Sequence, residues 1–95
     1  MYKGMKNEVV TLVTPVGEIV GRLSKVDDES LTLSNPRLFV HGGEEGAGFA
    51  PGVSMTGEPN PSSVTFVLQN VFSVVKTHAD IERGWQQATS GIVLT

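Results

Sequence analysis

The residues best suited to metal chemistry are a histidine and two glutamates in a glycine-rich segment. His41 is followed by two glycines and then by Glu44 and Glu45, so one imidazole and two carboxylates stand close together in the chain. Imidazole and carboxylate groups are common ligands of divalent metals such as zinc. However, the segment has a single histidine, its spacing fits no common metal motif, and the glycines leave the ligands unanchored. The sequence therefore favours a solvated acidic loop here and predicts no bound metal.

Three consecutive carboxylates form the second candidate for chemistry. Asp27, Asp28 and Glu29 follow one another directly. Pairs of carboxylates carry out general acid–base catalysis when both face one substrate and their environments separate their pKa values. Consecutive residues of a turn point in different directions, which works against such a pair. The sequence instead predicts a solvated turn in which the carboxylate of Asp27 accepts hydrogen bonds from turn amides.

Three further features have a chemical and a structural interpretation. The segment Gly46–Gly48 is similar to a phosphate-binding loop, but no Gly-Lys-Ser/Thr follows it and no helix is expected there. Trp85, the only tryptophan, is a candidate stacking platform for nucleic-acid bases, although helix packing is the favoured use. Lys3 and Lys6 form a small basic cluster that suits either a phosphate backbone or plain solvation. Because no nucleophile–base pair is visible, the sequence predicts a binding protein and not an enzyme.

Length and composition limit the class of protein. The chain has 95 residues, which allow one domain with one core. It has no cysteine, so disulfides and thiolate chemistry are excluded, and its net charge of −3 argues against a wholly basic nucleic-acid surface. No apolar stretch approaches the roughly 20 residues of a membrane helix, and charged residues interrupt the first twenty positions. We therefore expect a cytoplasmic protein that needs no cofactor and does not contact a membrane.

Hydrophobic alternation and β-branched residues indicate the elements that must position these groups. A turn around Pro15 and Gly17 joins the first two predicted strands into a hairpin. Gly21 lies inside the second strand, where a glycine permits a sharp bend. Pro36 interrupts the third strand and predicts either a bulge or an edge position. Asn70 suits a tight junction between the last two strands. Five strands are expected, at residues 8–14, 18–26, 31–40, 63–69 and 71–76.

The remaining segments are a long loop and a C-terminal helix. Residues 41–62 are rich in Gly and Pro, and irregular loops of this length are commonly functional. In residues 77–95, Thr77 and Asp80 resemble a capping box that starts a helix. Ile81, Trp85 and Ala88 then share one helical face. We expect this helix to pack against the sheet or against a neighbouring subunit.

Short motifs within residues 8–76 follow one another in a characteristic order. The first group contains a turn glycine (Gly17), a strand glycine (Gly21) and a closing aspartate (Asp27), and the second group lies near the end of the sheet. The motifs are Val10–Leu12, Val16–Glu18, Val20–Leu23, Val26–Asp27 and Leu31–Leu33, then Val67–Val71 and Val74–Val75. In order and spacing they resemble the Sm-like family of ring-forming barrels, especially its divergent members from viruses of bacteria.

The resemblance implies an all-β fold. It implies a single domain over residues 1–95, in which residues 8–76 form a five-stranded, strongly bent antiparallel barrel, 41–62 a loop between strands three and four, and 77–95 a helix and tail. Sm-like subunits form homo-oligomeric rings of about five to seven copies by pairing the fourth strand of one subunit with the fifth of the next. The two-sided apolar character of residues 71–76 suits such pairing. The expected interface residues are Val64, Phe66, Leu68, Val71, Phe72, Val74 and Val75.

The same resemblance implies a site for single-stranded RNA, but its usual residues have been replaced. The family positions fall on Asp27, Asp28, Glu29, Ser30, Gln69 and Asn70. A carboxylate does not stack on a base and repels phosphate, and the usual Arg-Gly pair of the second motif is absent. Two functions follow from the sequence. One is an RNA-binding scaffold or RNA chaperone with a degenerate pocket; the alternative is a protein-interaction or assembly ring that binds no RNA.

Overall fold

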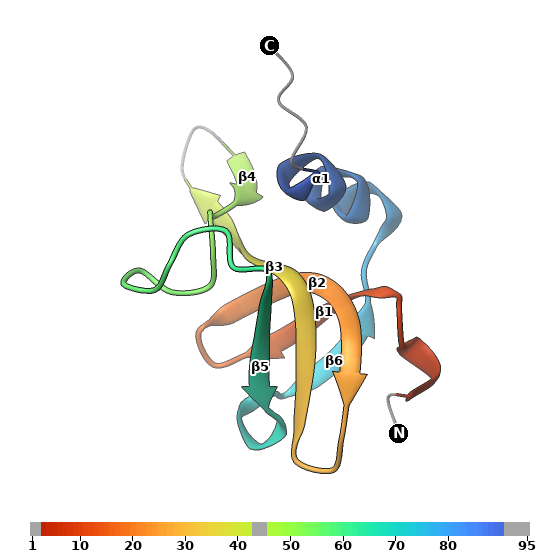
Figure 1. The fold of residues 1–95 in the computed structure, drawn as a ribbon. Helices are drawn as coiled ribbons and strands as arrows, with labels where there is room; N and C mark the ends of the chain where they lie inside the picture. The colour runs from red at the N-terminus through yellow and green to blue at the C-terminus, as the bar shows by residue number, and fades with distance from the viewer. Residues whose placement is uncertain (1–2, 43–45, 91–95) are drawn as a thin grey trace.

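The chain folds into one strongly curved antiparallel sheet with a helix packed on it (Figure 1). The computed structural model describes residues 3–42 and 46–90. In this part of the chain the sheet has six strands, in the order β4-β3-β2-β1-β6, and β5 pairs with β3 beside this path. The strands are β1 (Val9–Thr14), β2 (Gly17–Val26), β3 (Ser30–Gly42), β4 (Gly46–Phe49), β5 (Ser63–Val67) and β6 (Ser73–Lys76). Three helices accompany them: the 3-10 helices η1 (Lys3–Met5) and η3 (Leu68–Asn70), and α1 (Ala79–Thr89). The predicted all-β class with a C-terminal helix is confirmed.

The centre of the sheet is the hairpin of β1 and β2, extended by β3. Gly17 closes the β1–β2 turn with φ of 133°, a backbone conformation that favours glycine. Val20 pairs with Arg37 and Arg22 pairs with Ser34, so β3 has an extra residue between these two pairs. The extra residue lies at Asn35 and Pro36, and Asn35 adopts a positive φ of 50°. The structure therefore confirms a bulge at Pro36.

A sixth strand corrects the prediction that residues 41–62 form one long loop. Strand β3 continues to Gly42, and β4 folds back on it with Val40 paired to Gly48. The rings of Phe39 and Phe49 meet edge to face, with centroids 5.2 Å apart. This aromatic contact helps to hold a strand whose sequence, Gly-Ala-Gly-Phe, has low intrinsic β-propensity. The irregular segment therefore begins only after Phe49.

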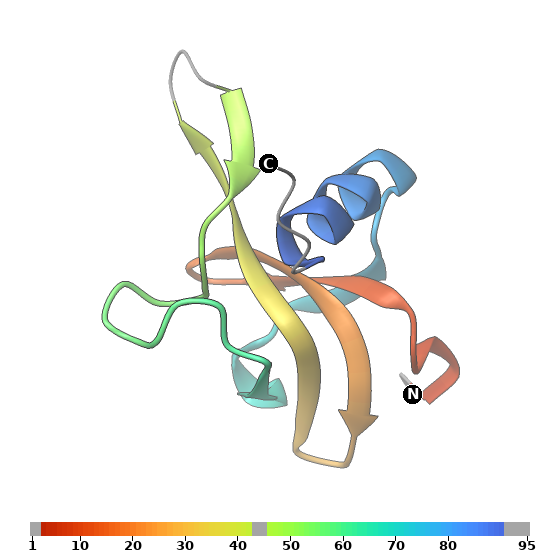
Figure 2. The same ribbon diagram turned by 45° about the horizontal axis from the view of Figure 1, so that its top comes forward.

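The sheet curls but does not close into a barrel within the described chain (Figures 1 and 2). Strand β5 pairs only with β3, and β6 pairs only with β1. The structure therefore shows an open, six-stranded sheet where the sequence predicts a five-stranded, strongly bent antiparallel barrel. The predicted strand at 71–76 begins at Ser73, because η3 and the two residues after it make the junction. Both β5 and β6 keep one edge without a paired strand among the described residues.

Two apolar layers lie on the two faces of the sheet. The larger one fills the inside of the curl, and its buried members are Val10, Leu12, Ile19, Leu23, Leu31, Leu33 and Val74. The smaller one lies under α1, where Trp85 packs with Val9 and Val20. Figure 2 shows α1 lying across the sheet on this second face. No helix in the described residues is long and apolar enough to span a membrane.

The helix begins one residue later than the capping box predicts. His78 is the N-cap, and its Nδ1 accepts a hydrogen bond from the backbone N–H of Asp80 at 3.1 Å. Thr77 is buried instead, and its hydroxyl forms a 2.9 Å hydrogen bond with the hydroxyl of Thr11 on β1. Thr77 therefore connects the sheet to the helix, and the capping role passes to His78.

Candidate interaction site

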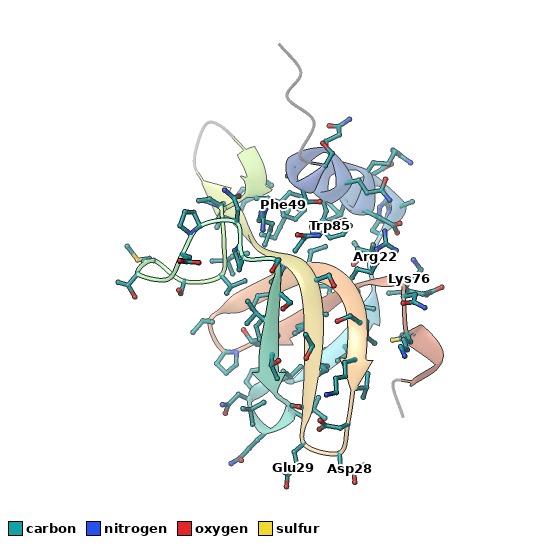
Figure 3. All side chains as sticks on the ribbon, viewed as in Figure 1. Arg22, Asp28, Glu29, Phe49, Lys76 and Trp85 are labelled. Atoms are coloured by element: carbon teal, nitrogen blue, oxygen red, sulfur yellow. The ribbon has the colours of Figure 1, made fainter. Side chains whose placement is uncertain are left out.

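The acidic β2–β3 turn and the 3-10 helix η3 lie side by side. The backbone N–H of Leu68 donates to the carbonyl of Glu29 at 2.9 Å, and Ser30 pairs with Val67 in the β3–β5 register. The structure thus brings together the two segments that carry the predicted RNA positions. Gln69 and Asn70 are exposed, as are Asp28 and Glu29, whose side chains project from the end of the turn (Figure 3).

Asp27 has a structural role within the same turn. Its Oδ1 accepts hydrogen bonds from the backbone N–H groups of Glu29 and Ser30, at 3.0 and 2.9 Å, and from the hydroxyl of Ser30. These bonds stabilise the ionised carboxylate and lower the pKa of Asp27. The prediction that Asp27 binds turn amides is confirmed. All three carboxylates are exposed, and Asp28 and Glu29 are the two whose side chains do not bind the turn amides.

The predicted interface residues fall into three groups by exposure. Val74 is buried in the core, so it does not lie on a free surface of the chain. Phe72 and Val75 are exposed, with 71% and 45% of their surface accessible. Val64, Phe66, Leu68 and Val71 are half-buried. The exposed residues flank or belong to β6, which has an unpaired edge among the described residues, and Val67 at the end of β5 is exposed as well.

A groove of about 410 Å³ opens between β5 and the β1–β2 turn. Its floor consists of Ile19, Phe66, Val71 and Val53, all of which belong to or pack against the larger core layer. The complete lining is Thr14, Pro15, Val16, Ile19, Val53, Thr65, Phe66, Val67, Asn70 and Val71. The groove is therefore mostly apolar, and it lies beside β5, where the sheet remains open. Sequence patterns gave no signal for it, because it depends on how far the sheet curls.

A smaller cavity of about 240 Å³ lies beside the start of α1. Its polar lining includes Lys76, whose ammonium pairs with Glu82 at 3.2 Å and with Glu8 at 3.9 Å. His78 also lines it, and its Nδ1 is engaged in the helix cap. Both groups already have partners within the chain, so this cavity offers little unused binding chemistry.

The metal and phosphate candidates do not assemble into sites in the described residues. His41 is exposed near the end of β3, and Glu44 and Glu45 lie outside the described part of the chain. No group of three or more His, Asp or Glu residues in the ranges 3–42 and 46–90 is placed to hold a metal ion. Gly46–Gly48 belongs to β4 and pairs with β3, so it is a strand and not a loop around a phosphate.

Trp85 is a packing residue and not a surface platform for bases. Only 3% of it is exposed, and its indole N–H donates to the carbonyl of Asn35 at 2.9 Å. The guanidinium of Arg22 lies over the ring, 5.7 Å from its centroid. The favoured prediction for Trp85 is therefore confirmed. Of the two N-terminal lysines, Lys6 is exposed, and the side chain of Lys3 lies outside the described residues.

No family model matches this chain, and no curated protein matches it either. Similarity to the Sm-like family therefore remains a prediction from the short motifs. The two surfaces that bear on function are the acidic surface, defined here as Asp28, Glu29, Gln69 and Asn70, and the open side. The open side consists of the edges of β5 and β6 with the groove beside β5.

Proposed function

We propose that the chain is the subunit of a homo-oligomeric, Sm-like ring that acts as a binding module without enzymatic activity. The observation that carries the proposal is the open sheet, in which β5 and β6 each keep an edge that no strand of residues 3–42 and 46–90 pairs with. These are the fourth and fifth of the strands expected from the sequence, which the family resemblance pairs between subunits. Pairing β5 of one copy with β6 of the next covers these two edges in every copy.

The physical reason for this assembly is the cost of leaving the two edges bare. An unpaired edge presents backbone N–H and C=O groups that attract other strands and promote aggregation. The contact is heterologous, because β5 and β6 are different surfaces, and a heterologous contact closes a ring when its rotation divides a full turn. Exposed apolar residues at both edges, Val67 and Val75, add buried apolar area to the contact.

For the ligand of the ring, the acidic surface favours a protein partner. Asp28 and Glu29 place two carboxylates beside η3, where the resemblance implies an RNA pocket. Carboxylates repel the phosphates of RNA, whereas they attract basic side chains of a protein. We therefore favour a protein-interaction or assembly ring.

RNA binding is the second candidate, and one observation favours it. The acidic turn and η3 are joined by the Leu68–Glu29 hydrogen bond, which supports a site formed by these two segments. Gln69 and Asn70 add amide groups that hydrogen-bond the edges of unpaired bases. In this case the chain is an RNA-binding scaffold or RNA chaperone with a modified pocket.

Light scattering of the purified chain during gel filtration tests the ring. We expect a mass of about five to seven chains; a monomeric mass contradicts the proposal. Val67→Lys and Val75→Lys place a charge at the two edges and should dissociate the assembly, because edge lysines oppose strand pairing. Met55→Lys is the matched control, since Met55 is fully exposed on the loop between β4 and β5. Its variant should assemble like the original chain.

Fluorescence anisotropy with U-rich and A-rich oligonucleotides at low salt separates the two ligand classes. A protein-interaction ring should show no binding near micromolar concentration. The double variant Asp28→Asn/Glu29→Gln removes the two exposed carboxylates and keeps the size of the side chains. Salt-sensitive binding by the original chain, strengthened in this variant, would support RNA as the ligand and overturn the preference for protein.

A further inference from the structure

The groove beside β5 exposes part of the core to solvent. Its floor residues Ile19, Phe66 and Val71 belong to or contact the larger core layer, and its rim residue Val16 is 79% exposed. An apolar groove of about 410 Å³ has room for one large apolar side chain, and filling it removes apolar surface from water. Polar groups are few in the lining, which makes an apolar side chain a better fit than a polar ligand.

The chain also presents a side chain that suits this groove. Phe72 is the only aromatic residue among the exposed large apolar residues of the described chain. Its backbone N–H donates to the carbonyl of Val13 at 2.7 Å, which fixes it directly before β6 at the edge of the sheet. Phe72 does not line the groove of its own chain. An exposed aromatic side chain beside an unpaired strand is typical of an interface anchor.

The groove extends from β5 to Val71, the residue directly before Phe72. Along β5 it adjoins a strand edge that is unpaired among the described residues, whereas Phe72 precedes β6, another edge strand. If β5 pairs antiparallel with β6 of the next copy, Ser73 of that copy lies near Val67 at the end of β5. The residue before Ser73 then lies beyond Val67, where the groove is located.

We propose that the groove is the receptor for Phe72 of the next copy, so that each subunit donates one aromatic anchor and receives another. The inference rests on the proposed ring and specifies its contact: antiparallel pairing of β5 with β6, locked by Phe72 next to Val16 and Val67. Because Phe72 and the β5 side of the groove are different parts of one chain, every copy donates one anchor and receives one. Such a contact is heterologous, and it closes into a ring when its rotation divides a full turn.

Two single variants should each break the contact from one side. Phe72→Ala removes the anchor, and Val16→Asp places a charge at the rim of the groove. Each should weaken assembly by roughly tenfold or more, as expected for a central anchor of an interface. Both positions are exposed, so the denaturation midpoint of the monomer should be unchanged. Phe72→Leu keeps an apolar anchor and should retain most of the assembly, and Met55→Ala is the control at an exposed position away from the contact.

Mixing the two variants gives the sharpest test. The Val16→Asp chain still has Phe72, and the Phe72→Ala chain still has an intact groove, so the mixture contains one complete contact. We expect one-to-one heterodimers in the mixture, although neither variant assembles alone. A contact in which Phe72 meets Phe72 predicts no such complementation, and the absence of heterodimers would overturn the proposal.

Cysteine cross-linking tests the register, because the chain has no cysteine of its own. A mixture of Val67→Cys and Ser73→Cys chains should form disulfide-linked dimers under mild oxidation. A mixture of Ser63→Cys and Ser73→Cys should not, since Ser63 is at the far end of β5. The opposite pattern indicates parallel pairing and overturns the proposal.

The outcomes also separate this inference from the ring itself. If the original chain is monomeric, both the ring and the anchor are wrong. If it assembles and Val67→Lys dissociates it, but Phe72→Ala and Val16→Asp do not, the ring stands and the anchor is wrong.

Discussion

The two faces of the curved sheet differ in how completely the chain covers them. On the helix side, α1 lies over β2 and β4, and Trp85 is 97% buried by Val9, Val20 and its other neighbours. On the open side, β5 and β6 have edges without a paired strand in the described part of the chain, and a groove reaches the core. The chain itself covers the first face. The second exposes apolar side chains and backbone N–H and C=O groups that a partner would cover. Folding and assembly should therefore depend on different residues.

The largest loss of stability should come from removing Trp85, the buried side chain that packs α1 against the sheet. Trp85→Ala deletes the ring that packs against Val9 and Val20 and the hydrogen bond to Asn35. Loss of a buried aromatic residue costs about 3–5 kcal/mol, so we expect the free energy of unfolding in urea to fall by that amount. Far-ultraviolet circular dichroism should show loss of helix signal at lower urea than in the original chain.

Gln87→Ala, an exposed position on the same helix, is the control and should change stability by less than about 0.5 kcal/mol. Since the proposed ring contact lies on the other side, Trp85→Ala chains that remain folded should still assemble if the proposal is right. A Trp85→Ala chain as stable as the original would show that α1 contributes little to the fold, and the distinction between the two faces would fail.

The next effect concerns the bend that both faces share. A Cβ added at Gly21 would lie 3.0 Å from the Cβ of Leu33 and 3.2 Å from the Cα of Pro36, so the β3 backbone must move. Overpacking of this kind costs about 1–3 kcal/mol. Gly21→Ala should lower the urea midpoint accordingly, whereas Gly48→Ala, which has no atom within 4 Å of the added Cβ, should not. Equal midpoints for the two variants would mean that the bend does not depend on this close approach.

Local sequence signals predicted the features that local chemistry controls. The β1–β2 hairpin follows from Gly17 in its turn, the bulge follows from Pro36, and the turn at residues 27–30 follows from the carboxylate of Asp27. Each of these depends on one residue and its near neighbours. For the same reason, the two segments of the acidic surface could be identified, although only the fold places them side by side.

The features that the sequence did not predict depend on contacts between distant residues. Strand β4 has weak strand propensity, and it forms where Phe49 meets Phe39 on β3. The groove requires the β1–β2 turn to lie near β5, a distance that no pattern encodes. Thr77 fits a helix cap by its spacing to Asp80, but burial against Thr11 gives it a different partner. Tertiary packing decided all three.

The hydrogen bond between Thr77 and Thr11 predicts a loss of stability of intermediate size on the helix side. Thr77→Val replaces the hydroxyl by a methyl group of similar size and leaves the buried hydroxyl of Thr11 without its 2.9 Å partner. A buried polar group left unpaired costs about 1–3 kcal/mol. The double variant Thr11→Val/Thr77→Val removes both hydroxyls and should recover part of the loss. Additive losses in urea unfolding would show that the two hydroxyls do not interact.

The smallest expected effect is a pH dependence of stability that arises from Asp27. Its hydrogen bonds hold the turn of the acidic surface within one chain, so no partner is needed. The pKa of Asp27 is lowered in the folded chain by hydrogen bonds from Glu29 and Ser30. The ionised carboxylate therefore contributes stability that is fully present above its unfolded pKa of about 3.9 and is lost as pH falls through the lower folded value. Asp27→Asn should thus be less stable than the original chain at pH 6, with a difference that shrinks as the pH falls below 4. Urea unfolding at several pH values measures this difference, and Asp28→Asn, which loses none of these bonds, is the control.

Because the bonds of Asp27 are internal to one chain, the same pH dependence should appear in assembled protein and in the Val67→Lys variant. A dependence found only in the assembly would place Asp27 at the interface and not in the turn alone.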